Sequence, residues 1–190
     1  MKTLTRNTKE TQISATLEIY GEGRAEISTN IGFFNHMLES LCKHSNWNLK
    51  LQCKGDLEVD FHHSVEDCGI VIGALLKDSL FPIQKVERFG NASIVMDEAC
   101  VECDLDLSNR PFLVFDLNVE GKVGDFDCEL VEEFFRAVII NAGISAHIVQ
   151  KRGSNKHHLI EAAFKAFAVA LRRASLKNEA LGIPSTKGVL

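Results

Sequence analysis

The chain has 190 residues, 45% of them hydrophobic, and a formal net charge of −5. This length and apolar content suffice for the packed core of one domain or of two small fused domains. The acidic balance gives no general attraction to nucleic acid or to an anionic membrane, and no apolar run reaches the roughly 18 residues of a membrane span. We therefore expect a cytoplasmic protein with neither nucleic-acid nor membrane partners.

Six cysteines raise the question of disulfides or a zinc site. Only Cys100 and Cys103 have CxxC spacing, and they lie inside an alternating strand pattern without a second such pair. We therefore expect free thiols, buried or half-buried, in a reducing compartment.

The first half of the chain predicts a strand pair, an amphipathic helix, a second strand pair and a second helix. Phe33, Phe34, Met37, Leu38 and Leu41 recur at the three- and four-residue spacing of a helix lying on a sheet. The expected elements are strands 11–20 and 24–29 joined by a turn at 21–23, a helix around 33–41, strands 47–53 and 57–61, and a helix that starts near 62 and ends before Pro82.

The second half repeats this plan with different loop lengths. Gly143 is expected to stop its first helix, and Ser154 or Asn155 to cap its last one. The expected elements are strands 92–96, 98–106 and 112–117, a helix from about 129 to 142, a strand at 145–149, and a helix with an apolar stripe over 160–171.

These repeated patterns favour the α+β class, with internally duplicated half-domains in which helices pack on one face of each β-sheet. Each half reads as a ββαββα-like repeat. We expect half-repeats at residues 1–85 and 86–190 that together form one functional unit.

One five-residue pattern, two histidines followed by a glutamate, occurs in both halves and begins at His62 and at His157. Residues four apart share a helix face, so His62 with Glu66, and His157 with Glu161, can each chelate one ion. A neighbouring side chain projects about 100° away around the helix. The second histidine of each pattern must therefore serve something else, and a second ion is the most economical answer.

If the two halves face each other, each can supply a His/Glu pair to one ion and its odd histidine to the other. The groups are then His62, Glu66 and His158 on one ion, and His157, Glu161 and His63 on the other. His36 and His147 are candidate fourth ligands, one for each ion, whereas His44 is a candidate substrate contact or structural residue. Such nitrogen and oxygen donors suit manganese, iron or zinc.

Three basic residues are candidates for binding an anion. Arg110 lies in a short loop between two predicted strands, and Arg88 and Lys187 have similar potential for a phosphate. The tail from residue 184 to 190 is small, polar and glycine-containing, which suits an anion clamp. For each basic residue the simpler alternative is a solvated surface charge.

Together these patterns resemble the imidazoleglycerol-phosphate dehydratase family over nearly the whole chain. The stretches that carry the resemblance are RNTKET at 6–11, GFFNHML at 32–38, HHSVED at 62–67, MDEA at 96–99, DLSNRP at 106–111, GSNKHH at 153–158, Glu161 with FKA at 164–166, and PSTKG at 184–188. Mild departures occur at Asn35, Phe61 and residues 151–152, and they leave the expected metal ligands in place.

The resemblance implies loss of water from imidazole glycerol phosphate to give imidazole acetol phosphate in histidine biosynthesis, with two manganese ions per active site. It also implies a homo-oligomer of twenty-four subunits with active sites between protomers. The implied ligands are His62, Glu66, His147 and His158 for one ion, and His36, His63, His157 and Glu161 for the other.

The resemblance also implies roles in catalysis and substrate binding. Glu10, offered across a subunit boundary, is expected to bind substrate and transfer a proton, and Glu66 and Glu161 to act in catalysis. Asp97 and Glu98 are open to either a proton-relay or a structural role. The remaining implied substrate contacts are His36, His44, Arg88, Arg110, Ser185 and Lys187, the last four holding the phosphate.

The reaction explains the need for metal. A metal held by these ligands would favour the imidazolate form of the substrate, whose electrons could then expel the hydroxyl group and leave a diazafulvene-like intermediate. A carboxylate then removes a proton from the next carbon to form an enol, which tautomerises to the ketone. The alternatives are a dinuclear metallohydrolase of a phosphorylated small molecule and a metal-organised storage or shell protein.

Overall fold

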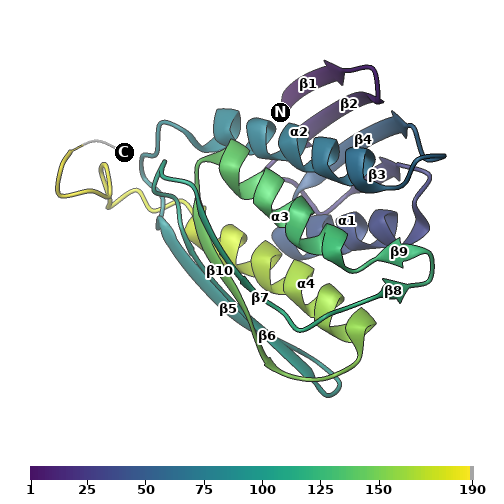
Figure 1. Cartoon of the computed structure of the whole chain (residues 1–190). Helices are drawn as coiled ribbons and strands as arrows, with labels where there is room; N and C mark the ends of the chain where they lie inside the picture. The colour runs from purple at the N-terminus through teal and green to yellow at the C-terminus, as the bar shows by residue number, and fades with distance from the viewer. Residues whose placement is uncertain (189–190) are drawn as a thin grey trace.

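Four helices lie between two four-stranded β-sheets in the computed structural model, which describes residues 1–188 (Figure 1). Val189 and Leu190, the end of the predicted tail, lie outside the described residues. The elements are β1 Lys2–Asn7, β2 Thr11–Glu18, β3 Ala25–Ser28, α1 Gly32–Ser45, β4 Asn48–Gly55, α2 His62–Leu80, β5 Phe89–Met96, β6 Ala99–Asp106, β7 Phe112–Asp116, β8 Lys122–Val123, β9 Phe126–Asp127, α3 Glu129–Ala142, β10 Ser145–Arg152 and α4 Lys156–Ala174.

The two large sheets have the same topology. Their strand orders are β1-β2-β4-β3 and β5-β6-β10-β7, and in each the first three strands are antiparallel while the last runs parallel to its neighbour. Helices α1 and α2 pack on the first sheet, whereas α3 and α4 pack on the second. The expected α+β class, with a duplicated arrangement of sheet and helices, is confirmed.

Apart from the short two-stranded sheet β8-β9, which the second half inserts before α3, the order within each half is β-β-β-α-β-α. This corrects the expected ββαββα-like order. Strand β1 was not predicted, and residues 57–61 form a turn and bend instead of a strand. Leu57 and Phe61 only half bury themselves against the core, and the residues between them are exposed. That segment has no strand partner, so its local alternation of residues has no ladder of hydrogen bonds to join.

The expected hairpin across residues 21–23 is also wrong. Strands β2 and β3 are not neighbours, because β4 lies between them and pairs with both. Leu49 and Leu51 of β4 are buried beside Leu17 of β2, which places this apolar strand in the interior of the sheet. A glycine-rich turn permits a tight hairpin, but it does not prevent a later strand of the chain, here β4, from pairing between the two strands that the turn connects.

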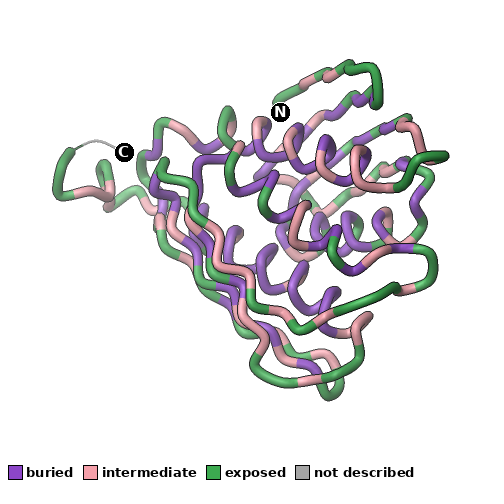
Figure 2. The backbone as a smooth tube through the Cα atoms, viewed as in Figure 1, coloured by how far each residue is buried: buried purple, intermediate pink, exposed green. Residues whose placement is uncertain are grey.

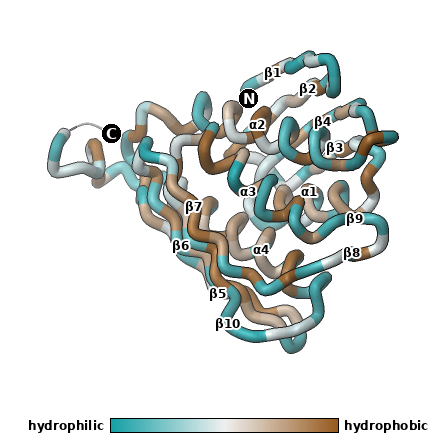
Figure 3. Tube along the Cα trace, in the orientation of Figure 1, coloured by the Kyte–Doolittle hydropathy of each residue, from teal (hydrophilic) through white to brown (hydrophobic). Residues whose placement is uncertain are grey.

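Alternation along the strands directs one face of each sheet toward the helices. In Figure 2 more buried and less buried positions alternate along β5, β6 and the first part of β10, and hydrophobic segments recur on the same strands in Figure 3. A cluster of phenylalanine rings fills the space between the helices, with the Phe135 ring 4.8 Å from Phe164 and 5.3 Å from Phe167. This core holds α4 at a fixed position on the second sheet.

Helix α4 runs from one end of the second sheet to the other. The Asn155 side chain caps its first turn by accepting from the N–H groups of His157 and His158, as predicted. At the other end, the N–H of Arg88, just before β5, donates to the Ala174 carbonyl at 2.8 Å. With 19 residues and about 1.5 Å of rise per residue, the helix separates these ends by roughly 28 Å.

The prediction of free thiols, buried or half-buried, is confirmed, since all six cysteines are free and none is exposed. The pKa of Cys103 is raised because burial penalises its thiolate form. Within residues 1–188, no helix combines the length and apolar character needed to cross a membrane.

Close contact between α2 and α3 depends on glycine. A Cβ at Gly73 would lie 2.5 Å from the Val138 carbonyl oxygen and 2.8 Å from the Asn141 Cβ. We expect Gly73→Ala to lower the free energy of unfolding by about 1–3 kcal/mol, because backbone must move to admit the methyl group. Urea denaturation of the metal-free protein measures this. Gly32→Ala, with nothing within 4 Å, is the matched control, and equal stability of the two variants would contradict the packing argument.

Candidate active site

His36, His157 and Glu161 form a three-residue group able to hold a metal ion. Their donor atoms lie within 4.8 Å of one another. The Glu161 Oε2 atom lies 3.2 Å from His157 Nε2 and 3.5 Å from His36 Nε2. His157 and Glu161 are one turn apart on α4, and His36 is brought to them by the packing of α1 on α4. Within residues 1–188 this is the only such group of three.

Glu161 is 7% exposed, so its charge depends on its neighbours. Burial raises the pKa of this carboxyl, but the Lys165 ammonium 2.8 Å from Oε1, with His36 and His157, outweighs burial and lowers the pKa below its ordinary value. The Oε2 atom remains directed at the two imidazoles. An ionised carboxylate beside two imidazoles is a donor set that fits manganese, iron or zinc.

The first copy of the repeated pattern lies at the start of α2. His62 Nε2 is 3.9 Å from Glu66 Oε2, which agrees with the expected pairing along the helix. His63 points elsewhere, with Nδ1 3.0 Å from Asp56 Oδ2 and Nε2 3.8 Å from Glu10 Oε1. The hydrogen bond to Asp56 raises the pKa of His63.

The hairpin that carries Glu10 is tied to the same helix. Asp67 of α2 accepts from Arg6 Nε at 2.9 Å and from the Thr11 hydroxyl. Thr8 Oγ1 accepts from the N–H groups of Glu10 and Thr11 at 3.1 and 2.9 Å. These contacts hold the stretch at 6–11 against the start of α2, and they fix the Glu10 carboxylate next to His63.

The second copy has a comparable arrangement at the start of α4. His158 Nδ1 lies 2.8 Å from Glu98 Oε2, and its Nε2 lies 3.8 Å from Asp97 Oδ2. The hydrogen bond from His158, supported by the Asn155 N–H, lowers the pKa of Glu98 to about 2, while the same contact raises the pKa of His158.

His147 and His44 lie apart from these groups. His147 is exposed on β10 between the buried Ala146 and Ile148, so it faces away from the helices. His44 lies half-buried at the end of α1. Burial, with the charges of Lys165 and Arg172, lowers the pKa of His44.

The basic candidates meet in a separate hollow of about 720 Å³. It is lined by Arg88, Phe89, Ser108, Asn109, Arg110, and residues Ile183 to Lys187 of the tail. Arg110 is exposed and forms no ion pair within the described part of the chain, whereas its carbonyl is held by hydroxyl donors, Ser108 at 3.0 Å and Ser145 at 2.7 Å. Its guanidinium is therefore available to an anion on a fixed loop.

Arg88 anchors the tail. Its Nε and Nη2 donate to Asp106 at 2.8 and 3.1 Å, and Nη1 donates to the Pro184 carbonyl at 2.7 Å. The following turn is closed by a hydrogen bond of 3.2 Å from the Lys187 N–H to Ser185 Oγ. Arg88 thus fixes the backbone that presents Ser185 and Lys187 to the hollow.

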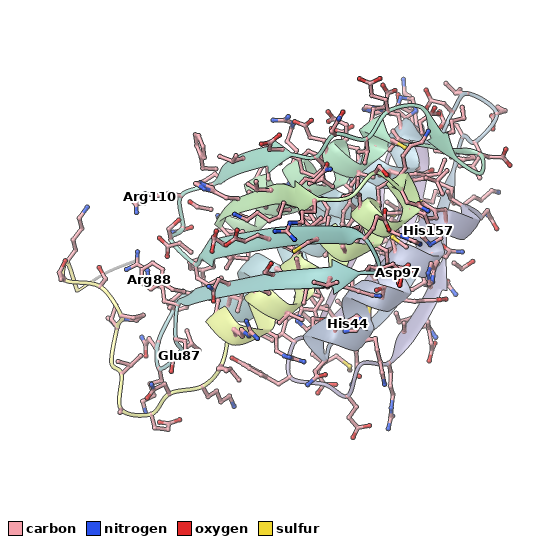
Figure 4. The ribbon with its side chains drawn as sticks, turned by 90° about the horizontal axis from the view of Figure 1, so that it is seen from below. His44, Glu87, Arg88, Asp97, Arg110 and His157 are labelled. Carbon is pink, nitrogen blue, oxygen red and sulfur yellow. The ribbon has the colours of Figure 1, made fainter. Side chains whose placement is uncertain are left out.

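The hollow and the histidine group at the start of α4 lie at opposite ends of the second sheet. Figure 4 places Arg88 and Arg110 toward one end and His157 and Asp97 toward the other. The whole length of α4 separates them. A small molecule in the hollow therefore cannot also reach His157 of the same chain.

Comparison with known proteins accounts for this combination of parts. Residues 29–171 match the family model described as imidazoleglycerol-phosphate dehydratase. The proteins of that name from Wolinella succinogenes and Aliarcobacter butzleri are 69% and 64% identical over 190 residues, covering 100% of both chains in each case. The chain belongs to the imidazoleglycerol-phosphate dehydratase family.

Solved structures of the family share the fold. The imidazoleglycerol-phosphate dehydratase of Staphylococcus aureus N315 has 41% identity and a TM-score of 0.83, covering 94% of this chain and 100% of that one. The Pyrococcus furiosus dehydratase, in complex with (S)-C348, has 36% identity and a TM-score of 0.85, covering 98% and 100%. The expected enzyme class, a hydro-lyase of histidine biosynthesis, is confirmed, and the hydrolase and shell alternatives are set aside.

Two contacts were not predicted from the sequence. Lys165 follows Glu161 by four residues on a helix, a spacing that signals an ion pair and was available from the sequence. The contact of Asp56 with His63 had no local signal, because it depends on how the loop after β4 folds back on α2.

The three-residue group predicts a metal affinity that depends on Glu161. We expect Glu161→Gln to weaken manganese binding on the order of 100-fold, because the amide brings no charge to offset that of the ion. Titration of chelated protein, followed by the magnetic resonance of free manganese, measures the dissociation constant. Glu132→Gln on α3, which removes a surface ion pair with Arg136, is the control. Equal affinity of the two variants would exclude Glu161 as a ligand.

Proposed function

We propose that this protein converts imidazole glycerol phosphate to imidazole acetol phosphate and water, using two manganese ions per active site. The observation that carries the proposal is the presence, in one chain, of imidazole and carboxylate donors at one end of α4 and an anion-binding hollow at the other. These are the two chemistries that a phosphorylated imidazole requires.

The proposed ligands are those expected from the resemblance. One ion takes His36, His63, His157 and Glu161, and the other takes His62, Glu66, His147 and His158. When bound, manganese would supply positive charge that favours the deprotonated imidazole ring of the substrate, and so the route through a diazafulvene-like intermediate.

The positions of these residues in one chain support ligand sets that are shared between copies. His36, His157 and Glu161 gather at the start of α4 and lack only His63, whereas His62 and Glu66 lie at the start of α2 and lack His147 and His158. If the α4 start of one copy meets the α2 start of another, the two copies exchange His63 and His158. This reciprocity supports active sites between protomers, and we propose the twenty-four-subunit assembly of the family.

The remaining roles follow from the contacts. Glu10 enters the site with His63, and its exposed carboxylate would transfer the proton of the reacting carbon. Arg110, Ser185 and Lys187 would hold the phosphate, so that binding energy is gained away from the reacting carbons. Arg88 was expected to hold the phosphate as well, but its guanidinium donates to Asp106 and to the Pro184 carbonyl, so we assign it the role of fixing the tail. His44 would contact substrate beside Lys165.

Two further expectations are retained as proposals. Residues 1–85 and 86–190 would be half-repeats of one functional unit, since each contributes one sheet, two helices and one histidine pattern. The free thiols support a reducing compartment, which we take to be the cytoplasm.

The direct test of the proposed reaction is an absorbance assay for imidazole acetol phosphate on chelated protein. We expect no product without metal and restored product formation on adding manganese, because the ring must be deprotonated before hydroxide can leave. Folded protein that binds manganese and forms no product would overturn the proposed reaction. Release of inorganic phosphate instead would indicate a hydrolase.

Active sites shared between copies predict complementation between two inactive variants. His157→Ala lacks a metal ligand and Lys187→Ala lacks a phosphate contact, so each homo-oligomer should have low activity at limiting substrate. Co-expressed in equal amounts, they should regain about one quarter of the wild-type activity, since each site draws the two residues from different copies. A His157→Ala/Lys187→Ala double variant co-expressed with wild type is the control for subunit mixing. Mixed oligomers without recovery would contradict the shared site.

A further inference from the structure

The second histidine of each pattern, His63 or His158, has a carboxylate next to its Nδ1 atom, whereas the first histidine does not. His158 Nδ1 lies 2.8 Å from Glu98 Oε2, and His63 Nδ1 lies 3.0 and 3.2 Å from the two oxygens of Asp56. The first histidines instead direct Nε2 at a carboxylate of their own helix. A carboxylate from a loop therefore meets the same ring atom in both halves.

Glu98 is itself held in place. Its Oε1 accepts from the N–H of Asn155 at 2.9 Å and of Ser154 at 3.4 Å, the two residues that precede α4. One carboxylate thus joins the β5–β6 hairpin, the start of α4 and the His158 ring. The ring cannot rotate without losing the bond to a group that the backbone keeps fixed.

Asp56 is fixed by a different loop. Its N–H donates to the Glu10 carbonyl at 3.1 Å, and its own carbonyl accepts from the Val59 N–H at 2.9 Å. Asp56 directly follows β4, whereas Glu98 lies between β5 and β6. These are not equivalent places in the two half-repeats, so the duplication of the fold does not account for the shared contact.

The chemistry of imidazole gives this contact a purpose. A carboxylate at Nδ1 accepts the ring proton there and leaves the lone pair of Nε2 for a metal ion. In both halves the acidic oxygen nearest to Nε2, from Glu10 or Asp97, is 3.8 Å away, beyond hydrogen-bond distance. The Nε2 atoms of His63 and His158 are thus oriented and ready to bind.

We propose that Asp56 and Glu98 are positioning residues, which set the tautomer and direction of His63 and His158 for the two manganese ions without binding metal or transferring protons themselves. The inference rests on the proposed metal sites and deepens them. It concerns the two histidines that each copy would contribute to the metal site of another copy. Their imidazole rings must already be oriented when the two copies meet.

The test replaces each carboxylate by its amide. Glu98→Gln and Asp56→Asn keep the shape but lose the charge, so the affinity for manganese should fall about 10–100-fold, while kcat recovers at saturating metal. Titration of chelated full-length protein gives the affinity. Glu102→Gln on β6, paired with Lys151, and Glu58→Gln in the exposed turn before α2, are matched controls that should bind manganese normally.

A second readout separates positioning from other roles. In cobalt-substituted protein, Glu98→Gln should change the visible spectrum of the ion and Glu98→Asp should restore part of it, whereas Glu102→Gln should leave it unchanged. Glu98→Asp also serves if Glu98→Gln does not fold. Normal metal affinity with a normal cobalt spectrum would overturn the inference, as would a kcat that stays low at saturating manganese.

The result is distinguishable from failure of the proposed reaction. Wild-type protein that binds manganese but forms no imidazole acetol phosphate would overturn the reaction alone, and the affinity of Glu98→Gln would still decide the inference. Wild-type protein that binds no manganese would overturn both.

Discussion

The burial of α4 between the second sheet and α1 is the constraint on which the rest of the molecule depends. From Leu159 to Leu171 nearly every side chain of this helix is buried. A helix so enclosed cannot shift along its axis without disrupting close-packed rings. Its first turn therefore stays beside His36, and its last turn stays beside the loop that carries Arg88. The same packing that stabilises the core sets the distance between the histidine group at the start of α4 and the hollow beside its end.

The distance between the two ends of α4 limits what a single copy can bind. The imidazole ring and the phosphate of the proposed substrate are joined by only three carbons, far less than the length of α4. A single chain can hold one end of such a molecule at a time, so catalysis by the proposed route requires a second copy to bring the other half-site. Under that proposal, metal binding and assembly would depend on the same histidines, and the two processes would be coupled.

The two halves have the same arrangement of sheet and helices, but the side chains at equivalent positions make different contacts. Both long helices begin with two histidines and carry a glutamate one turn on, yet Glu161 is buried with Lys165 while Glu66 is half exposed beside His62. Only the second half extends into a tail that lines the hollow with Arg88 and Arg110. The two halves thus have equivalent backbones but different side-chain contacts. Loop carboxylates, Asp56 and Glu98, hold the imidazole rings of His63 and His158.

Local signals in the sequence determined the class, the four helices and the residue types of the site. Helical spacing identified the pairing of His157 with Glu161, and Gly143 and Asn155 marked helix ends, because these effects act within a few residues. Only the tertiary structure decided that β4 separates β2 from β3, that His36 joins His157, and that Asp56 holds His63. It also decided that Arg110 lies a helix length from His157. Each of these depends on which distant segments bury their apolar faces against one another, and a local pattern of residues does not specify that partner.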